Sequence, residues 1–408
     1  MWNIIAALLL LAATAATAAE SVTIELRETA GIRRFTYPVA VALELPAPVS
    51  RNTNVRLLLD DKPIVAQFRA DRVRQGGSHF WVDFHTNLLP YQSKTYTLQY
   101  GPDVPAGPER KSGHELTESG DEWHIENAPY ISWTIPRDLG GLLKSVNFPP
   151  AEHLRAESPG LVLLDQAGQA HPLGAATGNR TLGRVVREGP LAVALRFEVA
   201  HTNPELQGVR SIVDLHLPVA KSWVAVDWKV IDPDKKTSAL RAELHLNLDK
   251  PTSSLPTLVD FGTTTLVYTA LRPRQQTELR AASTTGPHAG SGSAWQILRG
   301  SVGSLEPFVF GPKGYARNAQ GWAHVMDRKR CLALAVNNFA RRTDDRINIS
   351  AEGKVLLERS LNRNETSAHN PKQMSFRFWL HFVHFPPQHS AATSPQAMQN
   401  PVAVRVLN

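Results

Sequence analysis

The fold class can be inferred from two neighbouring stretches, Arg210-Ser211-Ile212-Val213-Asp214-Leu215-His216-Leu217 and Trp223-Val224-Ala225-Val226-Asp227-Trp228-Lys229-Val230-Ile231. In both, side chains alternate with a period of two, which is the pattern of a β-strand. Similar short runs, broken by Pro, Gly, Asn and Asp, recur along most of the chain. Helical periodicity is nearly absent, and only Leu139–Val146 and Thr393–Met398 indicate a turn or two of helix. The sequence therefore predicts an all-β protein whose antiparallel sheets pack face to face.

The spacing of these runs divides the chain into regions. Short alternating runs predict a small N-terminal β-barrel-like domain over residues 20–104. Residues 105–120 are rich in Pro, Gly and charge, which is typical of a linker. Longer strands predict a large antiparallel β-supersandwich over residues 121–386. Residues 387–408 are weakly patterned and are expected to form a polar tail.

Residues 1–19 have the pattern of a secretory signal peptide. The apolar run Ile4–Leu11 is followed by small residues, and Ala16-Thr17-Ala18 fits the site that a signal peptidase recognises. The apolar run is too short for a membrane anchor, which needs about 20 apolar residues, and no later segment suits a membrane span. We expect a secreted or periplasmic protein.

The composition is that of an ordinary globular protein. The 408 residues are 42% hydrophobic, and 44 Lys and Arg against 37 Asp and Glu give a formal net charge of +7. These values exclude a disordered chain, a collagen and a polytopic membrane protein. The chain has no Lys/Arg run of the kind that marks a nucleic-acid tail, so we expect no nucleic-acid partner, whereas an acidic polymer could be attracted by such a surface.

No motif identifies a metal site, a nucleophile or a cofactor site. The single cysteine, Cys331, excludes an intrachain disulfide and a Cys-based zinc site. His381 and His384 are three residues apart in a predicted strand, so their side chains point to opposite faces. The chain has no His-Glu-x-x-His, nucleophile elbow, phosphate loop or dinucleotide fingerprint. We expect neither a metal ion nor a cofactor; Asp214 and Asp227 would suit two-carboxylate hydrolysis only if the fold spaces them correctly.

Three predicted strands of the second region carry polar side chains on one side. Strand by strand, these residues are Asp214 and His216; Trp223, Asp227 and Lys229; and Arg241, Glu243 and His245. We expect them to line one surface of a sheet. Two interpretations remain open: a solvent-facing surface laced with cross-strand ion pairs, and a concave floor for a ligand. The mixture of charged groups with a tryptophan would suit a carbohydrate.

Several motifs carry a family resemblance. They are Gly321-Trp322-Ala323-His324-Val325-Met326-Asp327, Cys331-Leu332-Ala333-Leu334-Ala335-Val336, Phe376-Arg377-Phe378-Trp379-Leu380-His381-Phe382 and Trp81-Val82-Asp83-Phe84. Together they resemble the exo-rhamnogalacturonan lyase-like family, which has an N-terminal barrel, a central β-sandwich and a helical toroid. Here the chain ends soon after the sandwich. The resemblance therefore implies that the toroid is absent, and that a separate helical catalytic partner is possible.

The resemblance implies recognition or processing of an acidic plant-type polysaccharide or oligosaccharide, with cleavage by β-elimination. Such a reaction needs a base for the proton beside the uronate carboxylate and a cation for the enolate. The candidate bases are His216 and His245, and Lys229 or Arg241 would neutralise the carboxylate. The candidate substrate-binding residues are Asp214, Trp223, Asp227, Lys229, Arg241 and Glu243. Two alternatives remain open: a non-catalytic carbohydrate-binding or scaffold module, and a structural envelope protein.

Overall fold

The computed structural model describes residues 20–45, 54–74, 77–174, 178–263, 266–281, 295–310, 319–340, 344–360, 373–384 and 393–407. The predicted signal peptide lies outside these residues. Within them, the strands form five sheets, and the only helices are α1 (Thr393–Gln399) and the short 3-10 helix η2 (Pro204–Leu206). The prediction of an all-β fold is confirmed. No described helix is long and apolar enough to cross a membrane.

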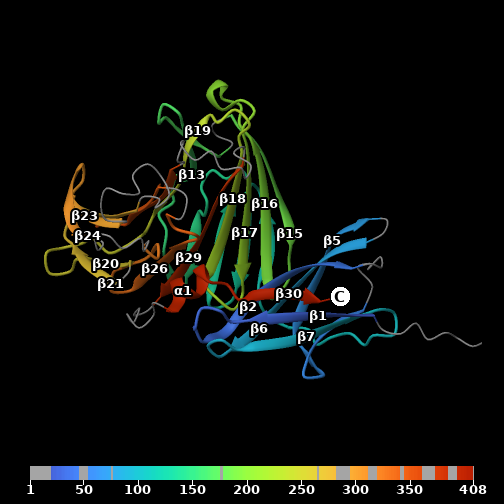
Figure 1. The fold of residues 1–408 in the computed structure, drawn as a ribbon. Coiled ribbons are helices and arrows are strands. Elements are labelled where there is room, and N and C mark those ends of the chain that lie inside the picture. The colour runs from blue at the N-terminus through green and yellow to red at the C-terminus, as the bar shows by residue number, and fades with distance from the viewer. Residues whose placement is uncertain are drawn as a thin grey trace, which may run out of the picture.

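Two large sheets make up most of the molecule (Figure 1). The nine-stranded sheet has the order β15 (Arg180–Arg187), β16 (Ala192–Ala200), β17 (Arg210–Pro218), β18 (Trp223–Ile231), β29 (Gln373–His384), β26 (Arg330–Val336), β25 (Trp322–Met326), β20 (Thr257–Gly262) and β21 (Leu266–Leu271). The eight-stranded sheet has the order β14 (Ala170–Pro172), β13 (Gly160–Asp165), β19 (Thr237–His245), β28 (Lys354–Ser360), β27 (Asp344–Ser350), β22 (Gln275–Ala281), β23 (Trp295–Ser301) and β24 (Ser304–Phe310). The pairing of neighbouring strands is antiparallel.

The apolar sides of these strands meet in one core. Val213 and Trp228 of the nine-stranded sheet and Leu240 and Leu244 of the eight-stranded sheet are almost completely buried in the same cluster. Removing such side chains from water is the main stabilising contribution of a β-sandwich, roughly 1.5–3 kcal/mol for each large one. The period-two pattern therefore places the apolar half of each strand between the sheets and the polar half outside.

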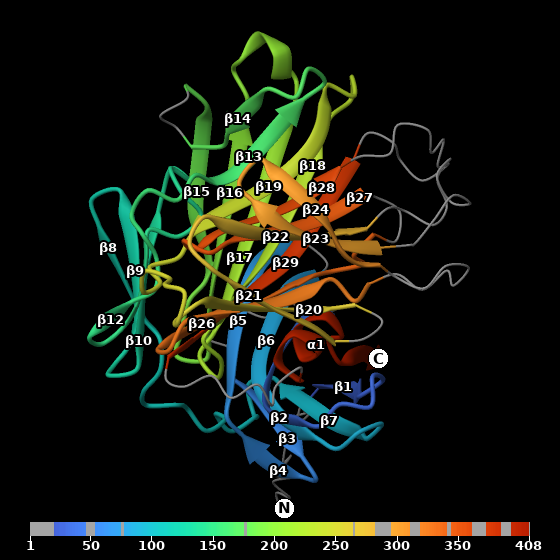
Figure 2. The ribbon, with the colours of Figure 1, turned by 90° about the vertical axis from the view of Figure 1, so that its left-hand side faces the viewer.

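A smaller sheet packs against the sandwich at one side (Figure 2). Its order is β12 (Ala151–Glu152), β11 (Ser145–Phe148), β10 (Ile131–Pro136), β9 (Glu122–Asn127) and β8 (Glu115–Ser119). Trp123 and Trp133 insert into the sandwich core, where their rings lie 5.5 and 5.7 Å from Phe197 and Phe382. Part of the segment that the sequence assigned to a linker is thus strand β8. Residues 139–146 form no helix, because Leu139 has a positive φ and two glycines follow it.

The N-terminal domain consists of two small sheets. One has the order β30 (Ala403–Leu407), β1 (Glu20–Arg27), β7 (Ser93–Tyr100), β3 (Val55–Leu59) and β4 (Lys62–Ile64), and the other β2 (Arg34–Leu45), β6 (Gly77–Leu88) and β5 (Ala66–Arg74). Ile24 and Leu98 of the first sheet pack against Val41 and Val82 of the second. Over the described residues these sheets do not close into a barrel. The domain is a small sandwich.

The C-terminal segment belongs to this N-terminal domain, so the expectation of a polar tail is wrong for residues 393–407. Strand β30 pairs with β1 along Ala403 to Leu407, and Figure 1 shows it beside the N-terminal strands. Arg34 donates to the carbonyl oxygens of Ala397 (2.8 Å) and Asn400 (2.6 Å), which fixes the end of α1. Met398 is buried. The side chains of β30 are all exposed, and the valines at 402, 404 and 406, which recur with a period of two, are the signal that could have predicted a strand here.

Candidate functional site

The predicted polar residues lie on two different sheets. Strands β17 and β18 are neighbours in the nine-stranded sheet, whereas β19 belongs to the eight-stranded sheet. Because the apolar sides of both sheets face the shared core, their polar sides point in opposite directions. The expectation that all three strands share one surface is therefore wrong. Alternation predicts which side of a strand is polar, but it does not predict which strands pair.

On the eight-stranded sheet the predicted residues are all ion-paired. Arg241 holds Glu358 at 2.7 Å, and Glu243 accepts from Lys354 at 2.6 Å and from His245 at 3.1 Å. Although burial opposes the change, the bonds from Lys354 and His245 hold the pKa of Glu243 below its usual range. This surface fits the first of the two interpretations, a polar face stabilised by cross-strand ion pairs.

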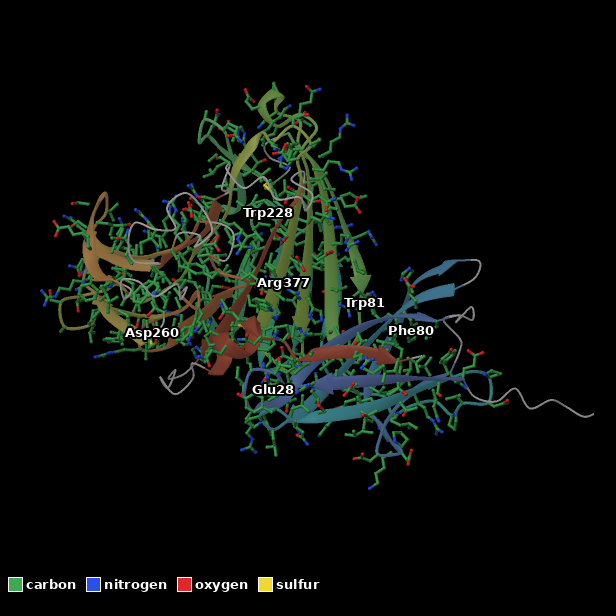
Figure 3. The ribbon with its side chains drawn as sticks, viewed as in Figure 1. Glu28, Phe80, Trp81, Trp228, Asp260 and Arg377 are labelled. Carbon is green, nitrogen blue, oxygen red and sulfur yellow. The ribbon has the colours of Figure 1, made fainter. Side chains whose placement is uncertain are left out.

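On the nine-stranded sheet four charged residues stand opposite one another in register. Arg196 of β16, Asp214 of β17, Asp227 of β18 and Arg377 of β29 form this set, which we call the charged row. Arg196 donates Nε and Nη2 to the two carboxylate oxygens of Asp214 at 2.6 and 2.7 Å. The Arg377 Nε lies 3.7 Å from Asp227 Oδ2, and its guanidinium lies over the Trp379 ring at 5.3 Å. Figure 3 labels Arg377 near the centre of the molecule.

The two carboxylates of the charged row have different partners. Asp214 has a bidentate bond to Arg196, while Asp227 faces Asp214 and, within the described part of the chain, has only the longer contact with Arg377. Burial raises the pKa of Asp227, and the negative charge of Asp214 adds to this effect. The side chain of Asp227 is still 48% exposed, so a ligand can reach it. The row thus offers one charge-paired carboxylate and one that binds protons or hydroxyl groups more readily.

The charged row lies in a wider surface, which we call the open face. Register places its other charged members on the same side of strands β15 to β18. The basic residues of the open face are Arg180, Arg184, Arg196, Arg210, Lys229 and Arg377, and the acidic ones are Glu198, Asp214 and Asp227. Basic groups therefore outnumber acidic groups, so this surface attracts anions.

The other half of the same sheet surface is covered by the N-terminal domain. Trp223 is only 5% exposed and packs edge-on against Tyr37 and His381, with ring centroids 6.0 and 5.9 Å apart. Ala225 and Trp379 belong to this same buried cluster. Trp223, which the sequence suggested as a substrate-binding residue, is thus part of the interface between the domains.

His216 lies where the N-terminal domain meets the open face. Its Nε2 is 3.7 Å from Asp83 Oδ1, which accepts a 2.6 Å bond from Arg187. Burial lowers the pKa of His216, and Arg187 adds to this effect. Arg187 also lies over the Trp81 ring at 4.2 Å, and Figure 3 labels Trp81 where the two domains meet. His216 is therefore a neutral imidazole at neutral pH, and its side chain is a quarter exposed.

Asp83 and Arg377 are the members of this site that sequence reasoning did not select. Both alternate with apolar neighbours, in Trp81-Val82-Asp83-Phe84 and Phe376-Arg377-Phe378, so each has the signal of an outward-facing strand residue. Nothing in the sequence shows that β29 pairs with β18, about 150 residues earlier.

The described residues contain no group of three or more His, Cys, Asp and Glu side chains arranged to hold a metal ion. Cys331 is buried, and burial raises the pKa of its thiol far above the usual range. A thiol in that state is not a nucleophile. The chemistry available at the open face is therefore that of arginine, lysine, carboxylate and one neutral histidine.

Comparison with known proteins supports the fold. No protein-family model and no characterised protein matches the sequence. Among solved structures, a glycosyl hydrolase family 38 protein from Enterococcus faecalis matches with a TM-score of 0.53 at 10% identity, over 95% of this chain and 47% of that protein. The chain thus spans about half the length of that structure. At 10% identity this likeness shows the β-sandwich fold alone.

Two weaker likenesses involve other sugar-related proteins. An α-N-acetylgalactosaminidase from Bifidobacterium bifidum matches with a TM-score of 0.36 at 9% identity, over 67% of this chain and 36% of that one. A putative aldose 1-epimerase from Klebsiella pneumoniae matches with a TM-score of 0.37 at 8% identity, over 71% of this chain and 87% of that one. Both scores are too low to transfer a site. None of these three proteins is a rhamnogalacturonan lyase.

Proposed function

We propose that the protein binds an acidic polysaccharide or oligosaccharide on the open face. The observation that carries this proposal is the charged row, in which Arg377, among the described residues, is held by a long contact with Asp227 and by the Trp379 ring. Arg377 is thus available to pair with the carboxylate of a uronate unit. Asp227 can accept hydrogen bonds from sugar hydroxyl groups at the same position.

The contrast between the two outer faces supports this choice of surface. On the eight-stranded sheet Glu358 is shared by Arg241 and Arg346, and Glu243 by Lys354 and His245, so a ligand would have to break these pairs. On the open face basic groups exceed acidic ones, so a polyanion gains attraction without such a loss. The sandwich shared with a glycosyl hydrolase family 38 protein is consistent with a sugar ligand, although fold alone does not specify function.

Calorimetric titration with rhamnogalacturonan, and with a neutral galactan as the comparison ligand, tests the proposal. We expect saturable binding of the acidic polymer that weakens as salt is added, because salt screens exposed charges. Arg377→Gln should weaken this binding about tenfold, since a charge-assisted hydrogen bond contributes roughly 1.5–3 kcal/mol.

A matched control variant lies on the opposite face. Arg280 is similarly exposed and pairs with Glu278 on the eight-stranded sheet, so Arg280→Gln removes the same charge without touching the open face. Equal weakening by Arg377→Gln and Arg280→Gln would show non-specific attraction and would contradict the proposal. So would the absence of binding to the acidic polymer.

A second candidate function is cleavage of the bound polymer by β-elimination, and the state of His216 favours it. A neutral imidazole can take the proton beside a uronate carboxylate, and Asp83 lies close enough to stabilise the resulting cation. Arg377, on the same sheet face, would pair with the carboxylate as the bond to the leaving oxygen breaks and water protonates that oxygen. His245 is the weaker candidate, because it lies on the other sheet and bonds Glu243.

Ultraviolet absorbance separates these two functions, because β-elimination leaves a conjugated double bond. Rising absorbance that is abolished by His216→Ala and retained by His245→Ala would support a lyase. Binding without any rise in absorbance would leave a carbohydrate-binding module.

A further inference from the structure

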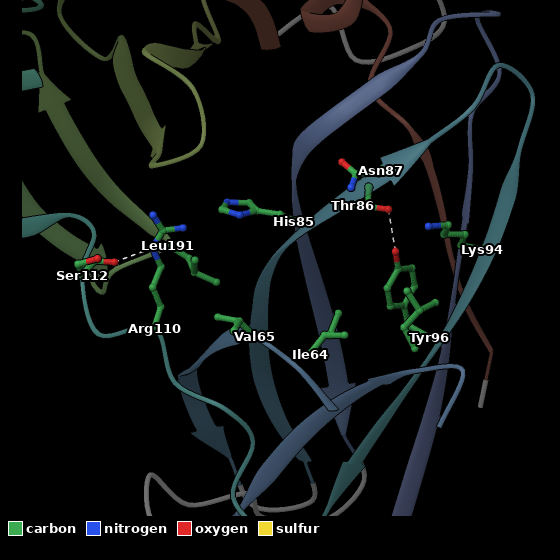
Figure 4. Close-up of a pocket in the computed structure, with 11 residues that line it drawn as sticks. Ile64, Val65, His85, Thr86, Asn87, Lys94, Tyr96, Arg110, Ser112 and Leu191 are labelled. Atoms are coloured by element: carbon green, nitrogen blue, oxygen red, sulfur yellow. Dashed lines mark hydrogen bonds between the residues drawn. The ribbon is translucent and has the colours of Figure 1, made fainter. Parts of the chain in front are cut away.

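A pocket of about 410 Å³, which we call the seam pocket, lies where the N-terminal domain meets the large sandwich (Figure 4). On the sandwich side it is lined by Leu191, the residue that precedes β16. Its walls come from the ends of β6 and β7, from the β3–β4 hairpin, and from residues 110–112, with Leu191 at the side of the large sandwich. This volume is within the range of small-molecule sites. None of its lining residues belongs to the open face.

The charges that line this seam pocket are all positive. Lys94 and Arg110 contribute to it, and none of the described lining residues is acidic. Arg110 donates Nε to the carbonyl oxygen of Ser112 at 2.5 Å and makes no ion pair within the described residues, and Lys94 makes none either. Two cations around one concave space whose described lining contains no acid favour an anionic occupant. The carboxylates that act on Tyr96 and His85, which are Asp60 and Asp83, lie outside the lining.

The remaining lining residues are a mixture of polar and apolar groups. Thr86 and Tyr96 share a 2.7 Å hydrogen bond through their hydroxyl groups, and each can accept a further one. The Nε2 of His85 is buried and has no partner among the described residues. Burial lowers the pKa of His85 to about 4, with Arg110 adding to the effect, so this ring is neutral and offers one hydrogen bond at Nε2. Ile64 and Leu191 supply apolar surface.

The positions of these groups indicate how a ligand would be oriented. Figure 4 shows Arg110 and His85 at one end of the pocket, and Lys94, Thr86 and Tyr96 at the other. A ring with hydroxyl groups, a carboxylate and an apolar C–H face would meet a suitable partner on each side. Phosphate and acetate lack the hydroxylated ring and so would leave part of this lining without a partner.

We propose that the seam pocket binds a single hydroxylated carboxylic acid of the hexuronate type. Its carboxylate pairs with Arg110, its hydroxyl groups bond Thr86 and Lys94, and its C–H face lies against Leu191. This site is separate from the open face and takes a free sugar acid rather than a polymer, so it does not depend on the function proposed above.

Calorimetric or NMR titration of the full chain with galacturonate tests this proposal, with galactose and acetate as comparison ligands. We expect galacturonate to bind at least about tenfold more tightly than either, because only galacturonate carries both the ring and the charge. Arg110→Gln and Lys94→Gln should each weaken galacturonate binding about tenfold. Lys62→Gln, an exposed change of equal charge on neighbouring β4, should leave it unchanged.

A variant that changes no charge tests whether galacturonate binds in the seam pocket. Val65 lines the pocket and is 40% exposed, so Val65→Trp should fill its mouth without disturbing a core. We expect this variant to lose galacturonate binding, whereas Arg377→Gln on the open face retains it. Binding that survives Val65→Trp, equal weakening by Lys62→Gln and Arg110→Gln, or equal affinity for acetate would each overturn the proposal.

Discussion

Asp214 and Asp83 each accept a short bond from an arginine, but in very different surroundings. Asp214 and Arg196 are 38% and 36% exposed at the surface, while Asp83 and Arg187 are 4% and 6% exposed between the two domains. Water screens the first pair, and the second pair has lost that solvation. The exposed pair can therefore exchange partners with a ligand, whereas the buried pair holds the domains together.

For these two ion pairs, we predict that Asp83→Asn strongly lowers the free energy of unfolding. It leaves the Arg187 charge buried without its counter-charge, which typically costs about 3–5 kcal/mol. Asp214→Asn is the matched control, because it removes the same group from the same kind of pair at the surface, and it should cost less than about 1 kcal/mol. Urea unfolding of both variants measures the difference. Equal losses would contradict the distinction between the pairs.

Among the elements, the packing of α1 and β30 on the N-terminal domain is the feature that is hardest to predict from the sequence. Thr393–Gln399 has the predicted helical pattern, and the structure confirms a helix there. Its docking depends on Arg34 and on Met398, which lie more than 360 residues apart in the chain. Contacts between residues so distant leave no periodic signal, so the sequence predicted the helix but not its place.

We predict that Met398→Ala lowers the free energy of unfolding by about 2–4 kcal/mol, because Met398 is 1% exposed in the domain core. Arg405→Ala on the exposed side of β30 should change it by less than about 0.5 kcal/mol. Thermal or urea unfolding checks both. A neutral effect of Met398→Ala would mean that α1 contributes nothing to the fold.

The strands themselves show where prediction from sequence succeeds. Alternation in β17, β18 and β19 correctly separated the side chains that face the sandwich core from those on the opposite side of each strand, and on β18 the N-terminal domain buries part of that opposite side at Trp223 and Ala225. Alternation does not predict which strands pair. The sequence therefore predicts Arg241 and Asp227 on one surface, although they lie on different sheets. Three of the eight predicted residues, Arg241, Glu243 and His245, lie outside the site for that reason, and Arg377 joins it because β29 pairs with β18.

For the whole molecule, the buried histidines determine the response to mild acid. Burial lowers the pKa of His114 and His201 to about 4 and that of His381 to about 3, against 6.5 for an exposed histidine. Below pH 6.5 the unfolded chain therefore binds protons that the folded chain does not. Stability falls as the pH decreases from 6.5 towards 4, by up to about 1.4 kcal/mol per pH unit for each fully buried histidine.

Buried carboxylates affect the stability of the fold at lower pH than the histidines do. Hydrogen bonds from Arg34 and from backbone amides outweigh burial and lower the pKa of Glu28 to about 2, from 4.5. Its contribution is complete above pH 4.5 and is lost only as the pH falls towards 2. We therefore predict that the urea midpoint already decreases between pH 7 and pH 5, above the range in which Glu28 loses its contribution. A midpoint that is constant over this interval would contradict the neutral, buried state of the histidines.

The central claim is that an acidic polysaccharide binds to the open face and not to the ion-paired surface behind it. Chemical modification of arginine side chains, followed residue by residue by mass spectrometry with and without rhamnogalacturonan, tests this directly. We expect the polymer to protect Arg196 and Arg377, while Arg280 and Arg346 react at the same rate as before. Protection of Arg280 and Arg346, or of no arginine on either face, would contradict it.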